Sequence, residues 1–144
     1  MKRVVFVCTG NTCRSPMAKG IFEVELNNRS ISNVSADSCG LSAMAGDEAS
    51  PNAVAAAKEL GADISPHRSK PLNPYMCNQT QLFVCMTQSH AQALMRYVPE
   101  NKIIVLNIPD PFGGDLDAYR ECARVILKKM GSIFDKLEED DEKL

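Results

Sequence analysis

The sequence predicts an α/β domain built around a parallel sheet. Short apolar runs typical of buried strands alternate along the chain with segments of helical periodicity. The strands are expected at residues 3–8, 34–38, 81–86 and 103–106, and the helices at 15–28, 51–60, 88–97 and 116–138. Strands that alternate with helices form right-handed βαβ units, and ligands of such sheets bind beyond the carboxyl ends of the strands.

Helix boundaries are marked by familiar residue pairs. Ser15-Pro16 and Ser50-Pro51 each predict a helix start, because serine is a good N-cap and proline is tolerated in the first turn. Gly61 is expected to end the second helix. The last helix shows the clearest periodicity, with one buried face formed by Tyr119, Cys122, Ile126, Met130, Ile133 and Leu137.

Length and composition limit the class of protein. The 144 residues suit one domain over residues 1–144, in which the acidic stretch at residues 138–144 is expected to be a frayed tail. The 16 basic and 18 acidic residues include no basic run interleaved with aromatics, which argues against nucleic-acid binding. No apolar stretch reaches transmembrane length and the polar start is unlike a signal peptide, so we expect no membrane association and a cytoplasmic location.

The six cysteines do not predict a disulfide scaffold or a metal site. A chain of this size without a secretory signal does not need disulfides. The two cysteines of the first loop lack a second pair at metal-ligand spacing, and the two histidines are far apart in sequence, so we expect no zinc or other metal and no cofactor. Of the others, Cys39, Cys85 and Cys122 are expected in the core or on helix faces, and Cys77 is expected to be structural.

The most informative segment is Val-Cys-Thr-Gly-Asn-Thr-Cys-Arg-Ser-Pro at residues 7–16. It places the Cys8 thiol and the Arg14 guanidinium at the two ends of a loop that runs from a buried strand into a helix. A helix N-terminus offers unpaired N–H groups and a positive dipole end to an anion, and it favours the nucleophilic thiolate of a cysteine. Arginine adds a planar fork that matches two phosphate oxygens. The segment therefore predicts phosphoryl transfer through a cysteinyl-phosphate.

Each residue of this loop has an ordinary structural explanation when taken alone. A strand-end cysteine is commonly just a small apolar residue, and Gly-Asn is a common turn. Together they favour an anion-binding loop, in which Gly10 and Asn11 are expected to adopt positive φ and Ser15 to donate a hydrogen bond to Cys8. The Gly-Lys-Ser/Thr ending of a Walker loop and the three glycines of a dinucleotide fingerprint are both missing.

Asp110 is the predicted general acid. It follows an apolar strand and precedes Pro111. A carboxylic acid facing the loop would protonate the leaving group and then activate water. Cys8 and Asp110 would form the minimal catalytic pair, with Arg14 and the loop N–H groups holding the equatorial oxygens. The alternative is that Asp110 is only a helix cap, although the last helix has other acidic residues at its start.

Cys8-x5-Arg14-Ser15, followed far downstream by Asp110-Pro111, resembles the signature of the low-molecular-weight protein tyrosine phosphatase family. Other segments match that family in order, namely Ser38-Cys39-Gly40, His67-Arg68-Ser69 and the apolar run 82–86, so the resemblance covers most of the chain. It implies a single three-layer domain with a four-stranded, flavodoxin-like parallel sheet of order 2-1-3-4 and helices on both faces.

The resemblance also implies roles for further residues. A set that binds phosphate or supports the loop would comprise Thr9, Gly10, Asn11, Thr12, Cys13, Arg14, Ser15, Ser38 and His67. Within this set, Asn11, Ser38 and His67 would form the supporting hydrogen-bond network. Because Cys13 shares the loop with Cys8, a reversible disulfide between them could protect the nucleophile, and such a pairing is known in the family. The alternative is that Cys13 only packs beneath the loop.

Two departures bear on the substrate. Tyrosine phosphatases of the family usually carry a bulky aliphatic residue where this chain has Thr12, and they often have two aromatics after the Asp-Pro pair, where this chain has only Phe112 in the lip. Both features resemble the protein-arginine phosphatase branch, so a protein phosphoarginine substrate is favoured, with inorganic phosphate as product. Phosphotyrosine is the main alternative. A thiol-dependent arsenate reductase, a phosphocarrier and a non-catalytic anion-binding module fit the sequence less well.

Overall fold

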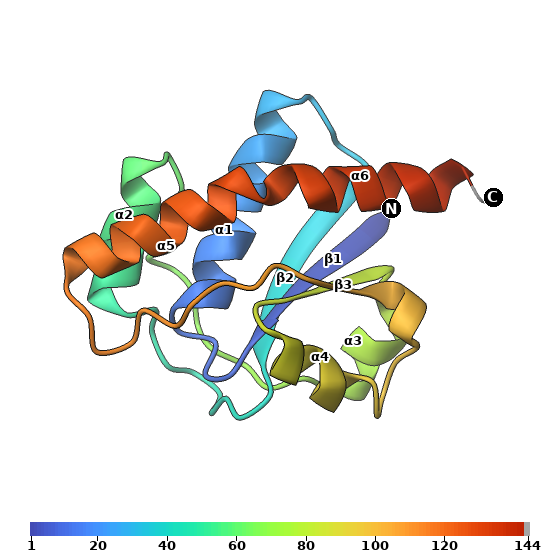
Figure 1. Ribbon diagram of the computed structural model, residues 1–144, viewed down its shortest axis with the longest axis horizontal. Helices are drawn as coiled ribbons and strands as arrows, with labels where there is room; N and C mark the ends of the chain where they lie inside the picture. Colours follow the sequence, from blue (N-terminus) through green and yellow to red (C-terminus); the bar gives the residue numbers. More distant parts are fainter. Residues whose placement is uncertain (143–144) are drawn as a thin grey trace.

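The computed structural model describes residues 1–142 and contains one parallel sheet (Figure 1). Its strands are β1 (Lys2–Cys8), β2 (Val34–Gly40), β3 (Leu82–Cys85) and β4 (Ile103–Val105), in the order β2-β1-β3-β4. All three neighbouring pairs are parallel. The predicted strands and their order are therefore confirmed.

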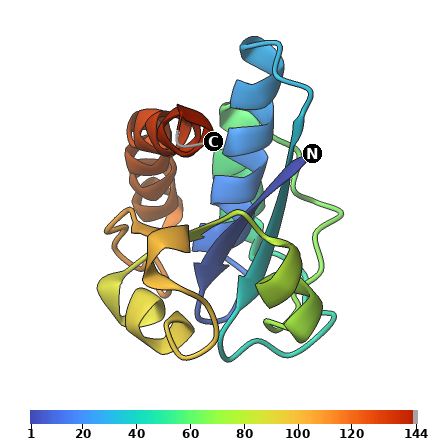
Figure 2. The ribbon, with the colours of Figure 1, turned by 90° about the vertical axis from the view of Figure 1, so that its right-hand side faces the viewer.

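Helices cover both faces of the sheet (Figure 2). They are α1 (Arg14–Asn28), α2 (Pro51–Glu59), α3 (Pro74–Gln79), α4 (Gln88–Leu94), α5 (Leu116–Lys128) and α6 (Met130–Glu142), with a 3₁₀ turn η1 (Glu100–Lys102) before β4. The helices α1, α2, α5 and α6 pack on one face, and α3 and α4 pack on the other. None of the helices within residues 1–142 is both long and apolar enough to span a membrane.

The alternation of side chains along β1 builds the two halves of the core. Val4 and Phe6 join the larger cluster beneath α1 and α5, whereas Val5 and Val7 join the smaller cluster beneath α3 and α4. Phe6 also meets the ring of Phe22 edge to face, with ring centroids 5.4 Å apart. A strand buried on both faces must be apolar at every position, which explains the continuous apolar run that precedes the loop.

The long C-terminal helix predicted over residues 116–138 is two helices. The first helix ends at Lys128, and the second begins at Met130. Between them, Lys129 donates from Nζ to the carbonyl oxygen of Leu106 at 2.6 Å. The two helices still lie nearly end to end (Figure 1), so the predicted apolar face stays on the core side of both. Residues 138–142 continue α6 as helix, and Asp141 pairs with Lys2; residues 143–144 of the expected tail lie outside the described residues.

Helix ends agree with the sequence in one case and differ in another. Ser50 caps α2 by accepting a hydrogen bond from the Ala53 N–H, and Gly61 follows α2 with φ of 88°, both as predicted. The prediction that Ser15 caps α1 is wrong, because α1 begins at Arg14 and Cys13 occupies the N-cap without a side-chain hydrogen bond. The Ser15 hydroxyl is instead used inside the loop.

Candidate active site

The loop between β1 and α1 curls around the sulfur of Cys8. The backbone N–H of Asn11 donates to Cys8 Sγ, with the two atoms 3.3 Å apart. Asn11 has φ of 58°, as predicted, but Gly10 is absent from the residues with positive φ, so that part of the prediction is wrong. The left-handed turn that brings the N–H groups inward is therefore made by Asn11 alone.

Gly40 is a loop-supporting residue whose role the sequence did not reveal. It is the last residue of β2 and lies in register with Cys8. A Cβ atom at Gly40 would come within 2.5 Å of the Thr9 carbonyl oxygen and 3.0 Å of the Asn11 nitrogen. Only glycine therefore lets the end of β2 pass this close beneath the loop.

Ser15 is placed to donate a hydrogen bond to the thiol of Cys8. Its Oγ lies 2.9 Å from Cys8 Sγ, and it also accepts a hydrogen bond from Asn11 Nδ2 at 2.7 Å. Because the amide of Asn11 supplies one proton to that oxygen, the hydroxyl proton of Ser15 is free to point at the sulfur. A donor aimed at sulfur stabilises the thiolate over the thiol.

The side chain of Asn11 is the centre of the network that holds the loop. Its Nδ2 also donates to Ser38 Oγ at 3.0 Å, and its Oδ1 accepts from the backbone N–H of Lys70 at 3.0 Å. His67 Nε2 lies 2.7 Å from the Asn11 carbonyl oxygen. Burial lowers the pKa of His67, and this hydrogen bond opposes the shift only in part, so a neutral imidazole donates here. The three side chains named from the resemblance thus meet around one loop.

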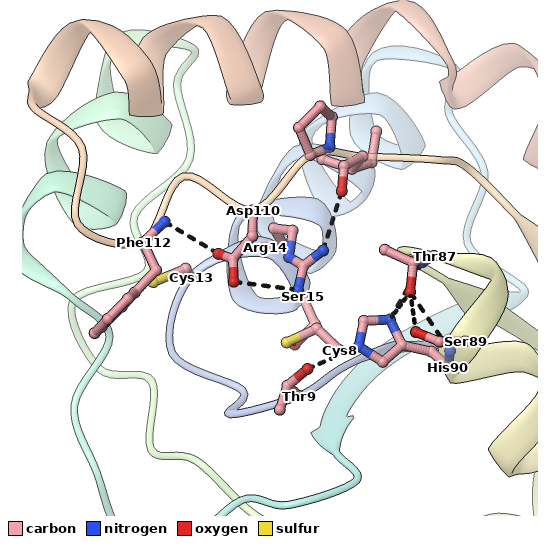
Figure 3. A network of polar contacts seen from close by, with 12 residues as sticks. Cys8, Thr9, Cys13, Arg14, Ser15, Thr87, Ser89, His90, Asp110 and Phe112 are labelled. Atoms are coloured by element: carbon pink, nitrogen blue, oxygen red, sulfur yellow. Dashed lines mark hydrogen bonds and ion pairs between the residues drawn. The ribbon is translucent and has the colours of Figure 1, made fainter.

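Arg14 and Asp110 face each other across the mouth of the loop (Figure 3). Arg14 is only 6% exposed and donates from Nη1 to the carbonyl oxygen of Ile108 at 3.0 Å. Its Nη2 lies 3.7 Å from Asp110 Oδ2. The Asp110 side chain is 54% exposed, and its Oδ1 accepts from the Phe112 N–H at 3.0 Å. Asp110 therefore does not cap α5, which is capped by Asp115.

These residues enclose a pocket of about 240 Å³ at the carboxyl edge of the sheet. Its lining consists of Cys8, Thr9, Gly10, Asn11, Thr12, Cys13, Arg14, Asp110 and Phe112. The thiol, the guanidinium and the carboxyl group thus share one opening, with Phe112 standing 80% exposed at the rim. Across residues 1–142, no three His, Cys, Asp or Glu side chains are placed to hold a metal ion.

Cys13 is a buried residue of the loop and also lines the pocket. Its Sγ lies 3.5 Å from Ser50 Oγ and 3.4 Å from the hydroxyl of Tyr119. Burial, together with the hydrogen bond to Cys13, raises the pKa of Tyr119. Both loop cysteines are free thiols here. A disulfide between them stays a prediction for the oxidised protein.

The remaining cysteines are poor candidates for a thiol relay. Cys39, Cys85 and Cys122 are buried as predicted, and Cys77 is half-buried. Burial raises the pKa of Cys85 and of Cys122 to about 12, and it raises that of Cys39 further. Thiols held protonated in this way are weak nucleophiles, which argues against the arsenate reductase alternative.

His90 is the second residue that sequence reasoning missed. It is buried on α4, and its Nε2 lies 2.9 Å from Thr9 Oγ1 at the start of the loop (Figure 3). In the structure Thr87 and His90 form a capping box at the start of α4, which is a role within that helix. Nothing local in the sequence indicates that α4 abuts the loop, because the contact joins residues 81 positions apart.

Comparison with known proteins agrees with this chemistry. The model of the low molecular weight phosphotyrosine protein phosphatase family matches residues 3–143, so the chain belongs to that family.

Three individual relatives are similar over nearly the whole chain. A protein-arginine-phosphatase of Geobacillus stearothermophilus is 33% identical, with 94% of this chain and 96% of the relative covered. A low molecular weight protein tyrosine phosphatase structure from T. tengcongensis is 36% identical, covers 97% of this chain and 99% of its own, and has a TM-score of 0.85. A serine mutant of the YwlE arginine phosphatase with a phosphorylated active site serine is 30% identical, covers 96% and 97%, and has a TM-score of 0.86.

Proposed function

We propose that this chain is a protein phosphatase that hydrolyses phosphoarginine on protein substrates through a phosphoryl group carried on Cys8. The observation that supports this most directly is the position of the Cys8 sulfur. It accepts from the Asn11 N–H and lies 2.9 Å from the Ser15 hydroxyl, in the same pocket as Arg14 and Asp110. Hydrogen-bond donors that converge on one sulfur stabilise the thiolate, which is the form that attacks phosphorus.

In the first step, the Cys8 thiolate attacks phosphorus as the bond to the leaving group breaks. The new S–P bond takes its electron pair from sulfur, and the pair of the broken P–N bond stays on the guanidinium nitrogen. Asp110, protonated at the start, gives its proton to that nitrogen. The loop N–H groups and the Arg14 fork hold the three equatorial oxygens.

In the second step, water attacks phosphorus and the S–P bond breaks. Asp110, now a carboxylate, accepts the proton of the attacking water, and the thiolate of Cys8 leaves. Inorganic phosphate is released and both residues return to their starting forms. The phosphorylated active site serine of the YwlE mutant supports a covalent step at the nucleophile of a similar site.

The lip of the pocket supports phosphoarginine over phosphotyrosine. Phe112 is followed by two positions that disfavour a second aromatic wall. Gly113 has φ of 83°, which side chains rarely adopt, and a Cβ at Gly114 would lie 2.7 Å from the Cβ of Ala118. A single exposed ring leaves the carboxyl group of Asp110 open to a polar guanidinium. The name of the Geobacillus relative agrees with this choice.

Turnover of matched peptides tests the proposed function. We expect the native chain to hydrolyse p-nitrophenyl phosphate, as reductases, carriers and binding modules would not, and to show the higher kcat/KM on a phosphoarginine peptide. The ratio of kcat/KM values for two substrates measures discrimination. A higher kcat/KM on phosphotyrosine would mean that the chain is a protein tyrosine phosphatase and not an arginine phosphatase. This second candidate function is favoured by the similarity to the T. tengcongensis tyrosine phosphatase.

Thr12→Ile is expected to shift the preference toward phosphotyrosine. Thr12 is half-buried in the pocket lining, beside the space that the group beyond phosphorus would occupy. The extra apolar bulk removes room and a hydroxyl that a guanidinium would use, and pocket changes of this kind are worth roughly 10- to 200-fold in kcat/KM. The measurement is kcat/KM on both peptides for native protein and variant.

Thr12→Val is the matched control, because valine has nearly the same shape as threonine and carries a methyl group in place of the hydroxyl. A preference retained in the valine variant but lost in the isoleucine variant would assign the selectivity to space. An unchanged ratio in both variants would mean that Thr12 does not set the substrate.

Asp110→Asn is expected to slow turnover by roughly 10²- to 10⁴-fold, the usual contribution of a general acid or base. The loss should be largest for substrates with poor leaving groups, because an acidic phenol such as p-nitrophenol needs little proton donation. Rates across a series of aryl phosphates measure this dependence. Asp117→Asn is the control, since Asp117 is an exposed acid that pairs with Arg120 outside the pocket. An equal loss for all leaving groups would exclude Asp110 as the acid.

A further inference from the structure

His90 connects α4 to the start of the loop between β1 and α1. It is the third residue of α4 and is 6% exposed. On one side, its Nδ1 accepts a hydrogen bond from the backbone N–H of Thr87 at 3.2 Å and lies 3.0 Å from Thr87 Oγ1. On the other side, its Nε2 lies 2.9 Å from Thr9 Oγ1. Thr9 lines the same pocket as Cys8.

The contact with Thr87 determines which ring nitrogen carries the proton. A backbone N–H can only donate, so Nδ1 must present a lone pair to Thr87. A neutral imidazole then carries its proton on Nε2, and Nε2 donates to the hydroxyl oxygen of Thr9. Because His90 supplies one proton to that oxygen, the proton of the Thr9 hydroxyl points elsewhere.

Burial and the positive charge of Arg14 favour this neutral form of His90. The charges that act on the ring are those of Arg14 on α1 and Asp110 on the loop after β4. Burial lowers the pKa of His90 first, and the positive charge of Arg14 lowers it further, while Asp110 opposes both. His90 is therefore a neutral donor at physiological pH, with its tautomer selected by the cap of α4.

We propose that His90 is a positioning residue that turns the Thr9 hydroxyl into a donor for a phosphoryl oxygen in the pocket. This inference rests on the proposed function, because it needs a phosphoryl group bound beside Cys8. Thr9 would then be a side-chain contact of the substrate, in addition to the backbone N–H groups of the loop. His90 itself would touch no substrate atom.

A double-mutant cycle of Thr9 and His90 tests this relay from His90 through Thr9 to the phosphoryl oxygen. The affinity for inorganic phosphate is measured by calorimetry. Thr9→Val should weaken phosphate binding roughly tenfold or more, on the scale of one hydrogen bond to a charged group. His90→Ala should weaken it as well, through loss of orientation. The double variant should be no weaker than Thr9→Val alone, because both changes remove the same contact. Losses that multiply, or native affinity in Thr9→Val, would overturn the proposal.

His90→Gln separates positioning from general support of the fold. Glutamine is a standard N3 residue of a capping box, so its carbonyl oxygen can accept from Thr87 while its amide donates to Thr9. We expect this variant to restore most of the affinity that His90→Ala loses. Ser89→Ala is the matched control on the same turn, since Ser89 is exposed and its hydroxyl contacts Thr87 and not the loop. Affinity as low in His90→Gln as in His90→Ala would contradict the relay.

The tautomer gives a readout that does not depend on activity. Two-bond proton–nitrogen correlations should show His90 at neutral pH as the neutral ring protonated at Nε2. The chain has two histidines, so the signals absent from the His90→Gln spectrum identify the ring. Protonation at Nδ1 would overturn the proposal and leave the proposed function intact. A native chain that neither binds phosphate nor turns over p-nitrophenyl phosphate would overturn both.

Discussion

Cys8→Ser is expected to lower phosphatase turnover by roughly four orders of magnitude or more, on the scale of other lost nucleophiles. A serine hydroxyl stays protonated under conditions in which a cysteine at a helix N-terminus is ionised, so the attacking group is removed while the side chain remains small and polar. The donors from Asn11 and Ser15 would then face a neutral hydroxyl. The measurement is the steady-state rate on p-nitrophenyl phosphate and on a phosphoarginine peptide.

The same variant should keep its fold and still bind inorganic phosphate. Arg14 and the N–H groups of the loop are unchanged by the substitution, and they supply most of the positive field. Calorimetric phosphate titration and thermal unfolding check these two points. Cys77→Ser is the matched control, because Cys77 is half-buried on α3, outside the pocket, and should retain full activity. Substantial turnover by Cys8→Ser would exclude the cysteinyl-phosphate mechanism.

The central strand and the loop after it could be predicted because their determinants are local. β1 is buried on both faces, so it appears in the sequence as an unbroken apolar run. The thiol and the guanidinium follow within one loop, and Pro16 marks the first turn of the helix that comes next. Asp110, the proposed general acid, could be named because it begins the Asp-Pro pair of the resembled family and because it follows another strand, since parallel strands end at the same edge of the sheet.

Other features depend on contacts between distant segments, which a local pattern does not encode. The hydroxyl of Ser15 looked like a helix cap, but it is used by Cys8 and Asn11. A glycine is needed at position 40 because β2 ends directly beneath the loop. His90 contacts Thr9 because α4 packs beside the loop. Each of these assignments needs the register or the packing of elements that the sequence only places in order.

Small helices and breaks were missed for a different reason. The helix α3 has six residues, too few for a periodic pattern, although Asn73 caps it by accepting from the Met76 N–H at 2.9 Å. The break at Lys129 leaves the apolar periodicity of α5 and α6 intact. Periodicity reports which face is buried, and it is insensitive to a single interrupted turn.

Arg14→Lys is expected to lower kcat/KM by roughly 10²-fold or more, the scale of one lost oxyanion-type contact. Two partners hold the Arg14 side chain in place. Nη1 is held by the Ile108 carbonyl oxygen, and Nη2 faces Asp110, which leaves the fork fixed at the mouth of the loop. Lysine would keep the charge but has a single ammonium group and no fork. It cannot hold the Ile108 oxygen and two phosphoryl oxygens in the same geometry.

The kinetic pattern should show where the arginine acts. If the fork binds the phosphoryl oxygens more tightly in the transition state than in the ground state, kcat should fall more than KM rises. Arg124→Lys is the matched control, because Arg124 is an exposed arginine of α5 that pairs with Glu121 and should leave both constants unchanged. Thermal unfolding of both variants checks that the lost Ile108 contact has not disrupted the loop. Near-native rates in Arg14→Lys would mean that positive charge alone suffices at this position and that the planar fork contributes nothing to the chemistry.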